Sequence, residues 1–417
     1  MATPEITSHY FNRIAFKNFT KNAIRQFGKT GWTVSQVGFG GYRVHHTSEQ
    51  HIAALKRALL GGVNLIDTSS NYTDGGSEIL VGNVMLNLVN LGKIARDEIV
   101  VVSKAGYVQG QNLKLVQERE AKGEPFKDVV KYMDGCWHCI HPDFLENQVR
   151  LSLGRLRSES LDVYLLHNPE YFLHDARKKG YLDLDSARNE YYRRIKLAFE
   201  WLEEKTAQGT IRAYGVSSNT FPNASDEFEF TSLERLLEIA EQVSANHHFQ
   251  VIQFPFNLYE TGACLTRNQA NDSKTLLELA RERRLATLVN RPLNAMTDAG
   301  MIRLASFRKT ESEVIEREFN TRLQKLKELE SLLTAEILDS LPPEINKENV
   351  QNIFVVSAQM ASARERFKGW SHWDHVKSNM LLPQISSYLF YLNDKLKDDP
   401  RLSIWAKEYL QTLNQLC

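Results

Sequence analysis

The sequence predicts an α/β protein that folds as a (β/α)8 TIM barrel with a long helical C-terminal extension or insertion. Over the first 300 residues or so, seven short runs rich in β-branched residues alternate with segments of helical periodicity. This alternation is typical of a parallel sheet with helices outside it. Such a sheet either stays open and doubly wound or closes into a barrel. The first predicted strand ends in GFGGYRV, which lacks the G-x-G-x-x-G spacing of an open dinucleotide-binding sheet, so the barrel is preferred.

The predicted strands are mostly continuous apolar runs, as expected for strands whose two faces are both covered. In a barrel of this kind, the carboxyl ends of the strands form one rim, and active residues lie on that rim. The seven strands are predicted at residues 34–40, 63–69, 98–106, 161–169, 211–219, 251–257 and 286–294.

The predicted helices begin near Ser, Thr or Asp and several end near Gly, in agreement with capping preferences. The first of them starts at a Ser48 cap and ends at Gly61. The full set covers residues 48–62, 77–89, 141–156, 190–209, 231–243 and 273–283. Each predicted helix lies between two predicted strands, which gives the repeating βα unit of the barrel.

The charge balance excludes some kinds of partner. Lys and Arg together number 51, as do Asp and Glu, so the formal net charge is zero. A bulk electrostatic attraction to nucleic acid or to an anionic membrane is therefore not expected. No apolar run approaches the roughly 20 residues that a membrane-spanning helix needs.

The first part of the chain contains no acidic residue between Ile6 and Ser48, whereas basic residues recur there. This pattern is one feature of an organelle transit peptide. A solvated N-terminal arm over residues 1–26 is the preferred interpretation, because no signal-type apolar core follows. A cytoplasmic protein is therefore expected.

Four cysteines are too few for a disulfide scaffold in a chain of 417 residues. Cys136 and Cys139 form a C-x-x-C next to His138 and His141, which raises the question of a metal or redox site. A structural zinc site needs a second pair of ligands at matched spacing, and a redox C-x-x-C opens a helix in a thioredoxin-like unit. Neither context is present, so no metal is expected and a loop lining a pocket is preferred.

Four polar residues fall at or just after the ends of successive predicted strands. Asp67 ends the second strand, Tyr72 follows in the loop, Lys104 ends the apolar run of the third, and His167 ends the fourth. A phenol has a reference pKa of about 10, which a nearby ammonium lowers. The carboxylate would keep the lysine charged, and the histidine would orient a substrate carbonyl. Each residue alone has an ordinary explanation, but together they predict a general-acid site for carbonyl reduction.

At this point the sequence resembles the aldo-keto reductase family. The matching segments are VSQVGFGGYRV, GGVNLIDTSSNYTDGGSEILVG, VVVSKAGY, SLDVYLLHNPE, GTIRAYGVSSN and LVNRPLNA, in the family's order over most of residues 27–296. The resemblance implies a (β/α)8 barrel over 27–298 that binds a nicotinamide dinucleotide, NADPH first and NADH not excluded. It implies that Tyr72 is the proton donor, that Lys104 and Asp67 tune it, and that His167 orients the carbonyl.

The same resemblance implies a set of cofactor-binding residues. Ser217 and Ser218 fall in the segment that holds the nicotinamide carboxamide, and Gln253 would contact the same group. The family often places an aromatic residue before x-P-L to stack on the nicotinamide, whereas this chain has Asn290 there. Three residues are expected along the pyrophosphate path: Arg291, Pro292 and Leu293.

Two long inserts, at residues 108–141 and 170–187, follow the third and fourth strands. At the carboxyl ends of strands they would rim the pocket and set specificity. They carry four aromatic or imidazole side chains that would suit an aromatic or sugar-like substrate, or that would simply pack the inserts together: Trp137, His138, Tyr171 and Phe172.

The resemblance fades after Ala295. Residues 299–417 are predicted to be mainly helical, with apolar positions spaced three and four apart. The run at 353–357 is a candidate eighth strand, and Ser357 and Glu365 then have the spacing of the family's adenosine-binding loop. Alternatively, the chain lacks a true eighth strand and its cofactor clamp is incomplete. The helices would close the barrel bottom, cover the pocket or mediate homo-oligomerisation.

Two classes of function therefore remain. The first is an NADPH-dependent oxidoreductase that interconverts a small-molecule carbonyl, from an aldehyde, ketone or sugar, with the alcohol. The second is a reductase-like binding or regulatory protein with weakened cofactor binding. The four polar side chains favour the enzyme, because the fold itself does not require them.

Overall fold

The computed structural model describes residues 1–13, 22–181, 183–297, 300–305, 312–363, 366–367, 373, 376–396 and 399–416. The chain divides into two compact units, residues 1–305 and residues 306–417. This division lies close to the boundary expected after residue 298. The two units are described separately below.

A curled parallel sheet of seven strands forms the centre of the first unit. The strands pair in the order β14-β11-β10-β9-β5-β4-β3, and each pair is parallel. Their bounds are β3 (Phe39–Gly40), β4 (Leu65–Asp67), β5 (Val100–Ala105), β9 (Leu161–His167), β10 (Ile211–Ser217), β11 (Phe249–Pro255) and β14 (Ala286–Asn290). The first predicted strand is divided between β2 (Thr33–Ser35) and β3. The predicted α/β barrel class is confirmed.

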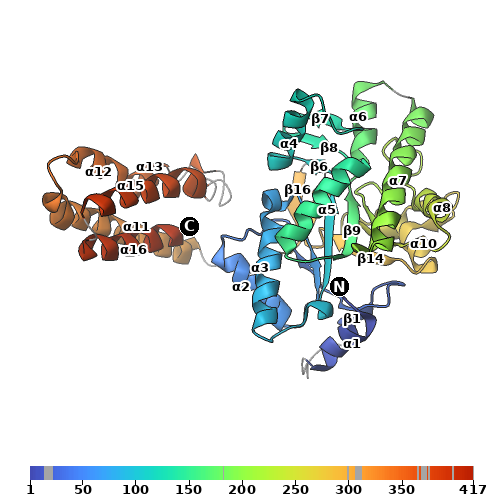
Figure 1. Cartoon of the computed structure of the whole chain (residues 1–417), viewed down its shortest axis with the longest axis horizontal. Helices are drawn as coiled ribbons and strands as arrows, with labels where there is room; N and C mark the ends of the chain where they lie inside the picture. Colours follow the sequence, from blue (N-terminus) through green and yellow to red (C-terminus); the bar gives the residue numbers. More distant parts are fainter. Residues whose placement is uncertain are drawn as a thin grey trace. The chain divides into compact units, whose positions relative to one another are not determined.

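Helices follow the strands and lie on the outside of the sheet (Figure 1). They are α2 (Glu49–Leu60), α3 (Gly76–Asn90), α5 (Pro142–Leu156), α7 (Leu184–Ala207), α8 (Leu233–Val243) and α10 (Leu276–Glu282). Their ends agree with the capping signals in the sequence. Ser48 accepts the backbone N–H of His51, and Thr275 forms a reciprocal capping box with Glu278.

The inside of the curled sheet is filled with side chains, as in other barrels of this kind. Alternate residues of the strands point inward, and a short N-terminal hairpin contributes Phe27 and Trp32 to the same cluster. The members from the strands are Leu65, Val100, Val102, Val163, Leu165, Ala213, Val251, Ala286 and Leu288. The unit therefore has a packed core inside the sheet and leaves the strand ends free for polar groups.

The N-terminal segment packs against the barrel. Helix α1 (Pro4–Arg13) is followed by β1 (Ile24–Gln26), which pairs antiparallel with β2. The N–H of Ala2 donates to Asp162 at 2.6 Å, and the buried hydroxyl of Tyr10 donates to the carbonyl of Leu59 at 2.6 Å. These contacts differ from the solvated arm expected from the sequence, because apolar and aromatic side chains in α1 reach the core.

The two inserts form a small layer of their own at the carboxyl ends of β5 and β9. The first contains a three-stranded antiparallel sheet of order β6-β8-β7 and one helix. Its elements are β6 (Tyr107–Val108), α4 (Gly110–Ala121), β7 (Val130–Met133) and β8 (Cys136–His138). The second insert is mainly α6 (Tyr171–Lys179). A separate small core holds the first insert together: Val108, Val116, Phe126, Cys139 and Phe144.

The chain after β11 and β14 is built of short elements. The loop after β11 contains α9 (Gly262–Leu265), β12 (Arg267–Gln269) and β13 (Lys274–Thr275). The chain after β14 forms an antiparallel hairpin of β15 (Asn294–Thr297) and β16 (Gly300–Arg303). Within the described ranges, no eighth strand pairs with the outer edge of β14 or of β3.

The second unit is a helical bundle with its own apolar core. Its main helices are α11 (Ser312–Leu332), α12 (Lys347–Ile353), α13 (Val356–Ala363), α15 (Leu382–Lys395) and α16 (Pro400–Gln415). The candidate strand at 353–357 is wrong, because these residues end α12 and begin α13. The buried side chains of Val350, Phe354 and Val356 pack in the bundle core, so tertiary packing has overridden the β propensity of this run. Glu365 lies outside the described residues.

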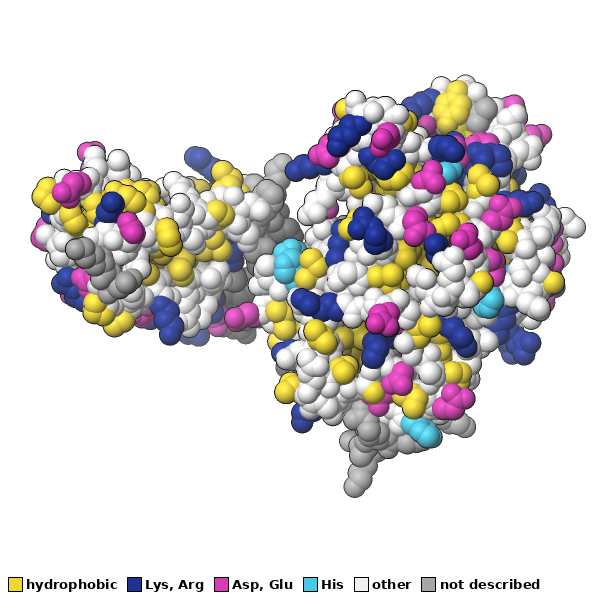
Figure 2. Space-filling model, in the orientation of Figure 1, with side chains coloured by type: hydrophobic (Ala, Val, Ile, Leu, Met, Phe, Trp, Pro, Cys, Tyr) yellow, Lys and Arg dark blue, Asp and Glu magenta, His cyan; other side chains and the backbone are white. Residues whose placement is uncertain are grey.

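The surface matches the balanced composition. Figure 2 shows Lys and Arg side chains mixed with Asp and Glu side chains over the visible face. Among the residues that the structure describes, no helix is long and apolar enough to cross a membrane.

Candidate active site

The structure brings the four predicted polar side chains together at the carboxyl ends of neighbouring strands. Asp67 is the last residue of β4, Lys104 lies near the end of β5, and His167 is the last residue of β9. Tyr72 begins a short 3-10 turn, η1 (Tyr72–Gly75), after β4. Parallel strands in register place these ends on one rim, which is why residues far apart in sequence become neighbours.

Lys104 is the centre of this group. Its side chain is fully buried, and its Nζ lies 2.7 Å from Asp67 Oδ1 and 2.9 Å from the carbonyl oxygen of Thr68. The third contact is with Tyr72, whose hydroxyl oxygen accepts from Nζ at 3.2 Å. An ammonium has three donors and each has an acceptor here, so the lysine is held in one orientation.

Burial and the neighbouring charges act in opposite directions on the pKa of these groups. Burial would lower the pKa of Lys104, but the carboxylate of Asp67 and the phenol of Tyr72 raise it, and it lies above its ordinary value. Burial raises the pKa of Tyr72, and although Lys104 lowers it, the pKa still lies above the ordinary value. The expected effect of the lysine on the phenol is present, but burial outweighs it. Tyr72 therefore keeps its proton and Lys104 its charge at neutral pH.

His167 is neutral in this environment. Burial lowers its pKa well below the ordinary value, and the positive charge of Lys104 acts in the same direction. Its Nδ1 lies 3.0 Å from the hydroxyl oxygen of Ser69, and its ring packs edge to face against Tyr72, with the centroids 5.7 Å apart. A neutral imidazole has one donor and one acceptor nitrogen, so the proton position decides what it offers a substrate.

The turn that carries Tyr72 has an unusual backbone. Thr73, Asp74 and Gly75 all have positive φ, at 49°, 54° and 87°. Thr73 donates to the carbonyl of Val44 at 2.7 Å, and Asp74 accepts the N–H of Gln111 at 3.0 Å. Left-handed non-glycine residues cost free energy and persist where the surroundings hold them.

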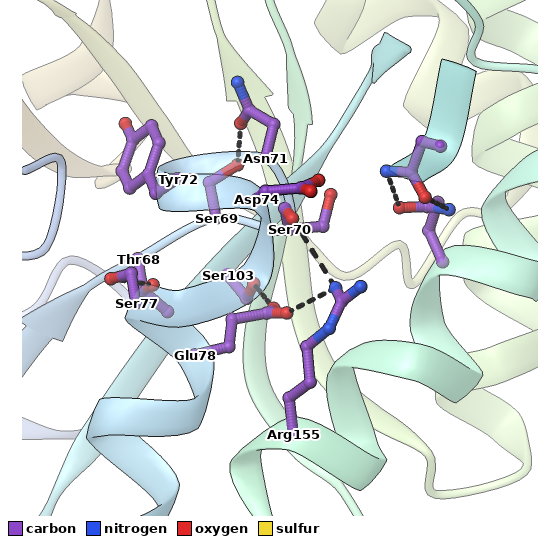
Figure 3. A network of polar contacts seen from close by, with 12 residues as sticks. Thr68, Ser69, Ser70, Asn71, Tyr72, Asp74, Ser77, Glu78, Ser103 and Arg155 are labelled. Carbon is purple, nitrogen blue, oxygen red and sulfur yellow. Dashed lines mark hydrogen bonds and ion pairs between the residues drawn. The ribbon is translucent and has the colours of Figure 1, made fainter. Parts of the chain in front are cut away.

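A buried ion pair lies beneath the same turn. Figure 3 shows that Glu78 from α3 accepts both from Ser103 and from Arg155, at 2.6 Å and 3.1 Å. The guanidinium also closes against Gly75, where an added Cβ would come within 2.6 Å of it. Gly75 thus fills a position that needs both a left-handed backbone and no side chain.

Two of the predicted cofactor residues are linked to Asp67, Gln253 directly and Ser217 through Gln253. Ser217, at the end of β10, donates to Gln253 Oε1 at 2.9 Å, and Gln253 Nε2 donates to Asp67 at 3.2 Å. Ser218 lies elsewhere, because its hydroxyl joins a buried cluster with Thr220 and Thr231. Successive strand residues face opposite sides, so Ser217 faces the site and Ser218 faces the helices.

Arg291 is engaged with the protein's own groups. Its Nε and Nη2 donate to the carboxylate of Glu260, and its Nη1 donates to Asn219 Oδ1 at 3.0 Å. Glu260 also accepts from Asn257 at 2.7 Å and from the N–H of Met296 at 3.2 Å. The guanidinium of Arg291 is therefore paired with the carboxylate of Glu260, whereas the sequence predicts that it lies along the pyrophosphate path.

The two residues that follow Arg291 are exposed. Pro292 and Leu293 lie in the turn between β14 and β15, and half of the Leu293 side chain is in contact with solvent. Asn290 ends β14, and its buried Oδ1 has no hydrogen-bond partner among the described residues. Asn290 pairs with Pro255, two residues beyond Gln253 on β11, and its unpaired buried acceptor suits a ligand that carries a hydrogen-bond donor.

The inserts bring an aromatic group to the side of His167. Tyr107 packs edge to face on His167, with centroids 4.8 Å apart, and accepts from Asn168 at 2.8 Å. His138 stacks on Tyr171 and contacts the carbonyl of His167 through Nε2 at 2.7 Å. Burial lowers the pKa of His138 to about 4, so it stays neutral.

The other two predicted insert residues have packing roles. Trp137 lies under Lys131, and Phe172 is buried under Arg194. All four side chains thus make packing contacts within the inserts or with the barrel, and a role in holding an aromatic or sugar-like substrate stays a prediction.

The cysteine pair has no partner set for a metal. Among the described residues, no group of three His, Cys, Asp or Glu side chains could hold a metal ion. Cys136 Sγ accepts from Gln109 at 3.2 Å, and the Cys139 thiol lies 3.4 Å from the carbonyl of Lys127.

Three residues of the site were not predicted. Ser69 lies within the strand-end segment that was singled out, two positions after Asp67, and this alternation was the available signal. Tyr107 follows the third strand directly after Gly106, where an insert residue can reach the rim. Glu260 gave no signal in the sequence, because its role depends on the path of the loop after β11.

Comparison with known proteins gives a consistent assignment. The model of the Aldo/keto reductase family matches residues 36–332. The NADH-specific methylglyoxal reductase of Escherichia coli is 28% identical over 148 residues, which are 34% of this chain and 40% of that protein. The aldo-keto reductase family 1 member A1 of the rat is 26% identical over 211 residues, 49% of this chain and 52% of that protein. The chain thus spans about half the length of such relatives, or less.

Solved structures of the same kind also match. An aldo-keto reductase of Bacillus halodurans in its holo form has a TM-score of 0.42 at 18% identity, covering 80% of this chain and 82% of that one. An aldo-keto reductase of Klebsiella pneumoniae in complex with NADPH has a TM-score of 0.37 at 22% identity, covering 66% and 69%.

Proposed function

The chain belongs to the aldo/keto reductase family, and from that premise we propose that it interconverts a small-molecule carbonyl and the corresponding alcohol by hydride transfer. A nicotinamide dinucleotide supplies or accepts the hydride when bound. We propose NADPH as the first candidate cofactor and NADH as the second, since one relative is NADH-specific and one solved relative holds NADPH.

Each of the four polar side chains has a separate role in this proposal. Tyr72 donates its proton to the substrate oxygen as negative charge develops there, and takes a proton back in the reverse direction. Lys104 stabilises the phenolate that this leaves, because its charged Nζ lies 3.2 Å from the Tyr72 hydroxyl. Asp67 keeps the lysine charged. His167 stands beside the same oxygen and orients the carbonyl by a hydrogen bond.

The observation that carries this proposal is the fully buried Lys104, whose three donors meet Asp67, the Thr68 carbonyl and Tyr72. A buried ammonium is costly, and packing alone does not need it. Its arrangement stabilises negative charge on the Tyr72 phenol, which is what proton transfer to a carbonyl oxygen requires.

The cofactor would lie across the rim with its carboxamide at Ser217, Gln253 and Asn290. This proposal is supported by the link from Ser217 to Gln253 and from Gln253 to Asp67, which is itself paired with Lys104. Arg291 would receive the pyrophosphate after leaving Glu260.

The test begins with binding. The purified protein is titrated separately with NADPH and NADH, and quenching of the fluorescence of its six tryptophans is recorded. Saturable binding of either, followed by oxidation of that cofactor in a screen of aldehydes, ketones and sugars, is the expected result. Absence of binding at millimolar concentrations of both would contradict the proposal.

A second function is favoured by two specific observations. Glu260 occupies Arg291, and among the described residues no eighth strand completes the sheet. A reductase-like binding or regulatory protein with weakened cofactor affinity would have these features. The same titration separates the two, because that protein would bind neither cofactor tightly.

A further inference from the structure

A chain of four hydrogen-bonding side chains connects His167 to the first insert. The hydroxyl oxygen of Ser69 lies 3.0 Å from His167 Nδ1 and 2.7 Å from Asn71 Oδ1. The Nδ2 of Asn71 lies 3.2 Å from Gln109 Oε1, and the Nε2 of Gln109 lies 3.2 Å from Cys136 Sγ. Figure 3 shows the first of these links, between Ser69 and Asn71.

The donors and acceptors along this chain of side chains can be arranged in two directions, which are called its two polarities here. In the orientation just given, Ser69 donates its single proton to Asn71, so it must accept from an Nδ1–H of His167, and Nε2 carries no proton. A half turn of both amides reverses every link. Cys136 then donates to Gln109, Gln109 to Asn71 and Asn71 to Ser69, while Ser69 donates to Nδ1 and the proton of His167 lies on Nε2.

The ends of the chain permit both polarities. Burial raises the pKa of the Cys136 thiol, so the S–H remains available as a donor. The Lys104 carbonyl, which accepts the N–H of Ser70 at 3.0 Å, is another acceptor for the Ser69 proton, but at 3.2 Å it lies farther from the Ser69 hydroxyl than Asn71 Oδ1 or His167 Nδ1 does. The pKa of His167 is low, so the ring is neutral and has one proton to place.

We propose that the chain Ser69–Asn71–Gln109–Cys136 sets the tautomer of His167, and that Ser69 is a positioning residue for the reaction. The substrate oxygen is most negative in the transition state and needs a donor, so the competent polarity is the one with Ser69 donating to Nδ1 and a proton on Nε2. The same transition state serves reduction and oxidation, so a change of polarity slows both directions. This inference rests on the proposed function.

The sharpest test fixes the polarity with a nearly isosteric change. In Gln109→Glu the side chain can only accept, which forces Asn71 to donate to it, Ser69 to donate to Asn71, and His167 to carry its proton on Nδ1. Gln111→Glu is the matched control, since it adds the same charge two positions away at an exposed side chain. Both positions are at least partly exposed, so both variants are expected to fold.

Two further variants test the serine. Ser69→Ala removes the link to His167. Ser70→Ala is its control, because Ser70 is equally buried, loses the same hydroxyl, and that hydroxyl has no hydrogen-bond partner in the part of the chain that the structure describes. Cys136→Ser keeps a donor at the far end of the chain, whereas Cys136→Ala removes it.

The first readout is the tautomer itself, measured without substrate or cofactor. Long-range 1H–15N NMR of histidine-labelled protein reports which ring nitrogen is protonated, and the signals of His167 are identified by their loss in His167→Gln. The expected result is a proton on Nε2 in the wild type and both controls, and on Nδ1 in Gln109→Glu. A proton on Nδ1 in the wild type, or on Nε2 in Gln109→Glu, would overturn the proposal.

The second readout is kinetic. Gln109→Glu and Ser69→Ala are expected to lower kcat about tenfold relative to their controls in both directions, with little change in the cofactor Kd. The kcat of Cys136→Ala is expected to be lower than the kcat of Cys136→Ser. Equal kcat values for variants and controls in an enzyme that needs Tyr72 would refute the positioning role and leave the proposed function intact. An inactive wild type would contradict the proposed function. The NMR experiment needs neither substrate nor cofactor, so it would still show whether the hydrogen-bonded side chains set the tautomer of His167.

Discussion

The two sides of the barrel rim differ in how their polar groups are paired. On the side formed by β4, β5 and β9, Lys104 is buried. Its Nζ donates to Asp67, the Thr68 carbonyl and Tyr72, which are themselves part of the site. On the β14 side, Arg291 is only partly buried and is paired with Glu260, a residue of the loop after β11. The first side is set up for proton transfer before any ligand arrives. The second side must exchange a protein carboxylate for a phosphate.

This difference separates two requirements of a reductase. Proton transfer needs fixed geometry, because a small displacement of the donor costs much of the rate. Cofactor binding tolerates rearrangement, since the exchange of one anion for another on a guanidinium lowers affinity without disturbing the reacting atoms. The comparison therefore predicts that substitutions on the first side change kcat and that those on the second side change Kd.

The largest effect is expected for Tyr72→Phe. The ring remains in place against His167, but the proton donor is lost, so kcat should fall about 10³-fold while the cofactor Kd stays within about twofold of the wild-type value. Single-turnover oxidation of NADPH and a fluorescence titration measure the two quantities. A variant that retained most of its turnover would show that Tyr72 is not the acid.

Asp67→Asn should have the next largest effect. The carboxylate raises the pKa of Lys104 against the effect of burial, so its loss lets the ammonium lose its proton at a lower pH. We expect kcat about 10²-fold lower and the alkaline limb of its pH profile moved to lower pH. Asp74→Asn, an exposed carboxylate on the adjacent turn, serves as the control. An unchanged alkaline limb would disprove the role of Asp67.

Glu260→Gln tests the other side of the rim. Without the competing charge, Arg291 is free for a pyrophosphate, and the amide oxygen can still accept from Asn257 and Met296. The cofactor Kd should fall about tenfold, with kcat nearly unchanged. Arg291→Gln should weaken binding instead. If Glu260→Gln bound cofactor no better than the wild type, Arg291 would have no part in holding the phosphates.

The smallest effect on activity is expected for Glu170→Gln, which links the two sides. Glu170 accepts the N–H of Asn219 at 2.8 Å, and Asn219 in turn accepts from Arg291. Burial raises the pKa of Glu170 from 4.5 to about 7. The folded state therefore binds more protons than the unfolded state between these values, and stability falls as pH rises through that window.

The neutral amide removes this dependence. The free energy of unfolding of Glu170→Gln minus that of the wild type should increase by roughly 3 kcal/mol between pH 4 and pH 8, since 2.5 pKa units correspond to about that energy. Urea unfolding at several pH values measures it. A difference that did not vary with pH would mean that Glu170 has an ordinary pKa.

The sequence was most informative where spacing alone determines position. Asp67, Lys104 and His167 could be placed on one rim because parallel strands end together, and the seven strands followed from apolar runs. Spacing alone could not separate Ser217 from Ser218, because adjacent residues of a strand face opposite sides and the resemblance named both. The run at 353–357 was one of two alternatives, a candidate strand or no eighth strand, since β-branched residues at the junction of two helices have the same pattern as a strand.

The state of Arg291 could not be predicted for a different reason. Its pairing with Glu260 depends on where a loop of irregular structure brings a carboxylate, and no periodicity encodes that position. The net pKa of Tyr72 was equally out of reach, because it depends on the balance of burial against one charge. Sequence pattern thus predicts which strand-end groups lie close together. The direction in which their pKa values shift can be worked out only from the packed structure.

The order of the strands in the sheet has a consequence for how the chain is made. From β3 to β14 the spatial order is the chain order, so each strand finds its neighbour already synthesised when it leaves the ribosome. No pairing has to wait for a segment from the far end of the sheet. The two ends of the unit meet at the floor instead, where Gly28 lies so close to Ala286 that an added Cβ would come within 2.2 Å of the Ala286 nitrogen. The strand order therefore allows the sheet to pair progressively as the chain is made, whereas the contact between Gly28 and Ala286 joins two segments that lie far apart in the sequence.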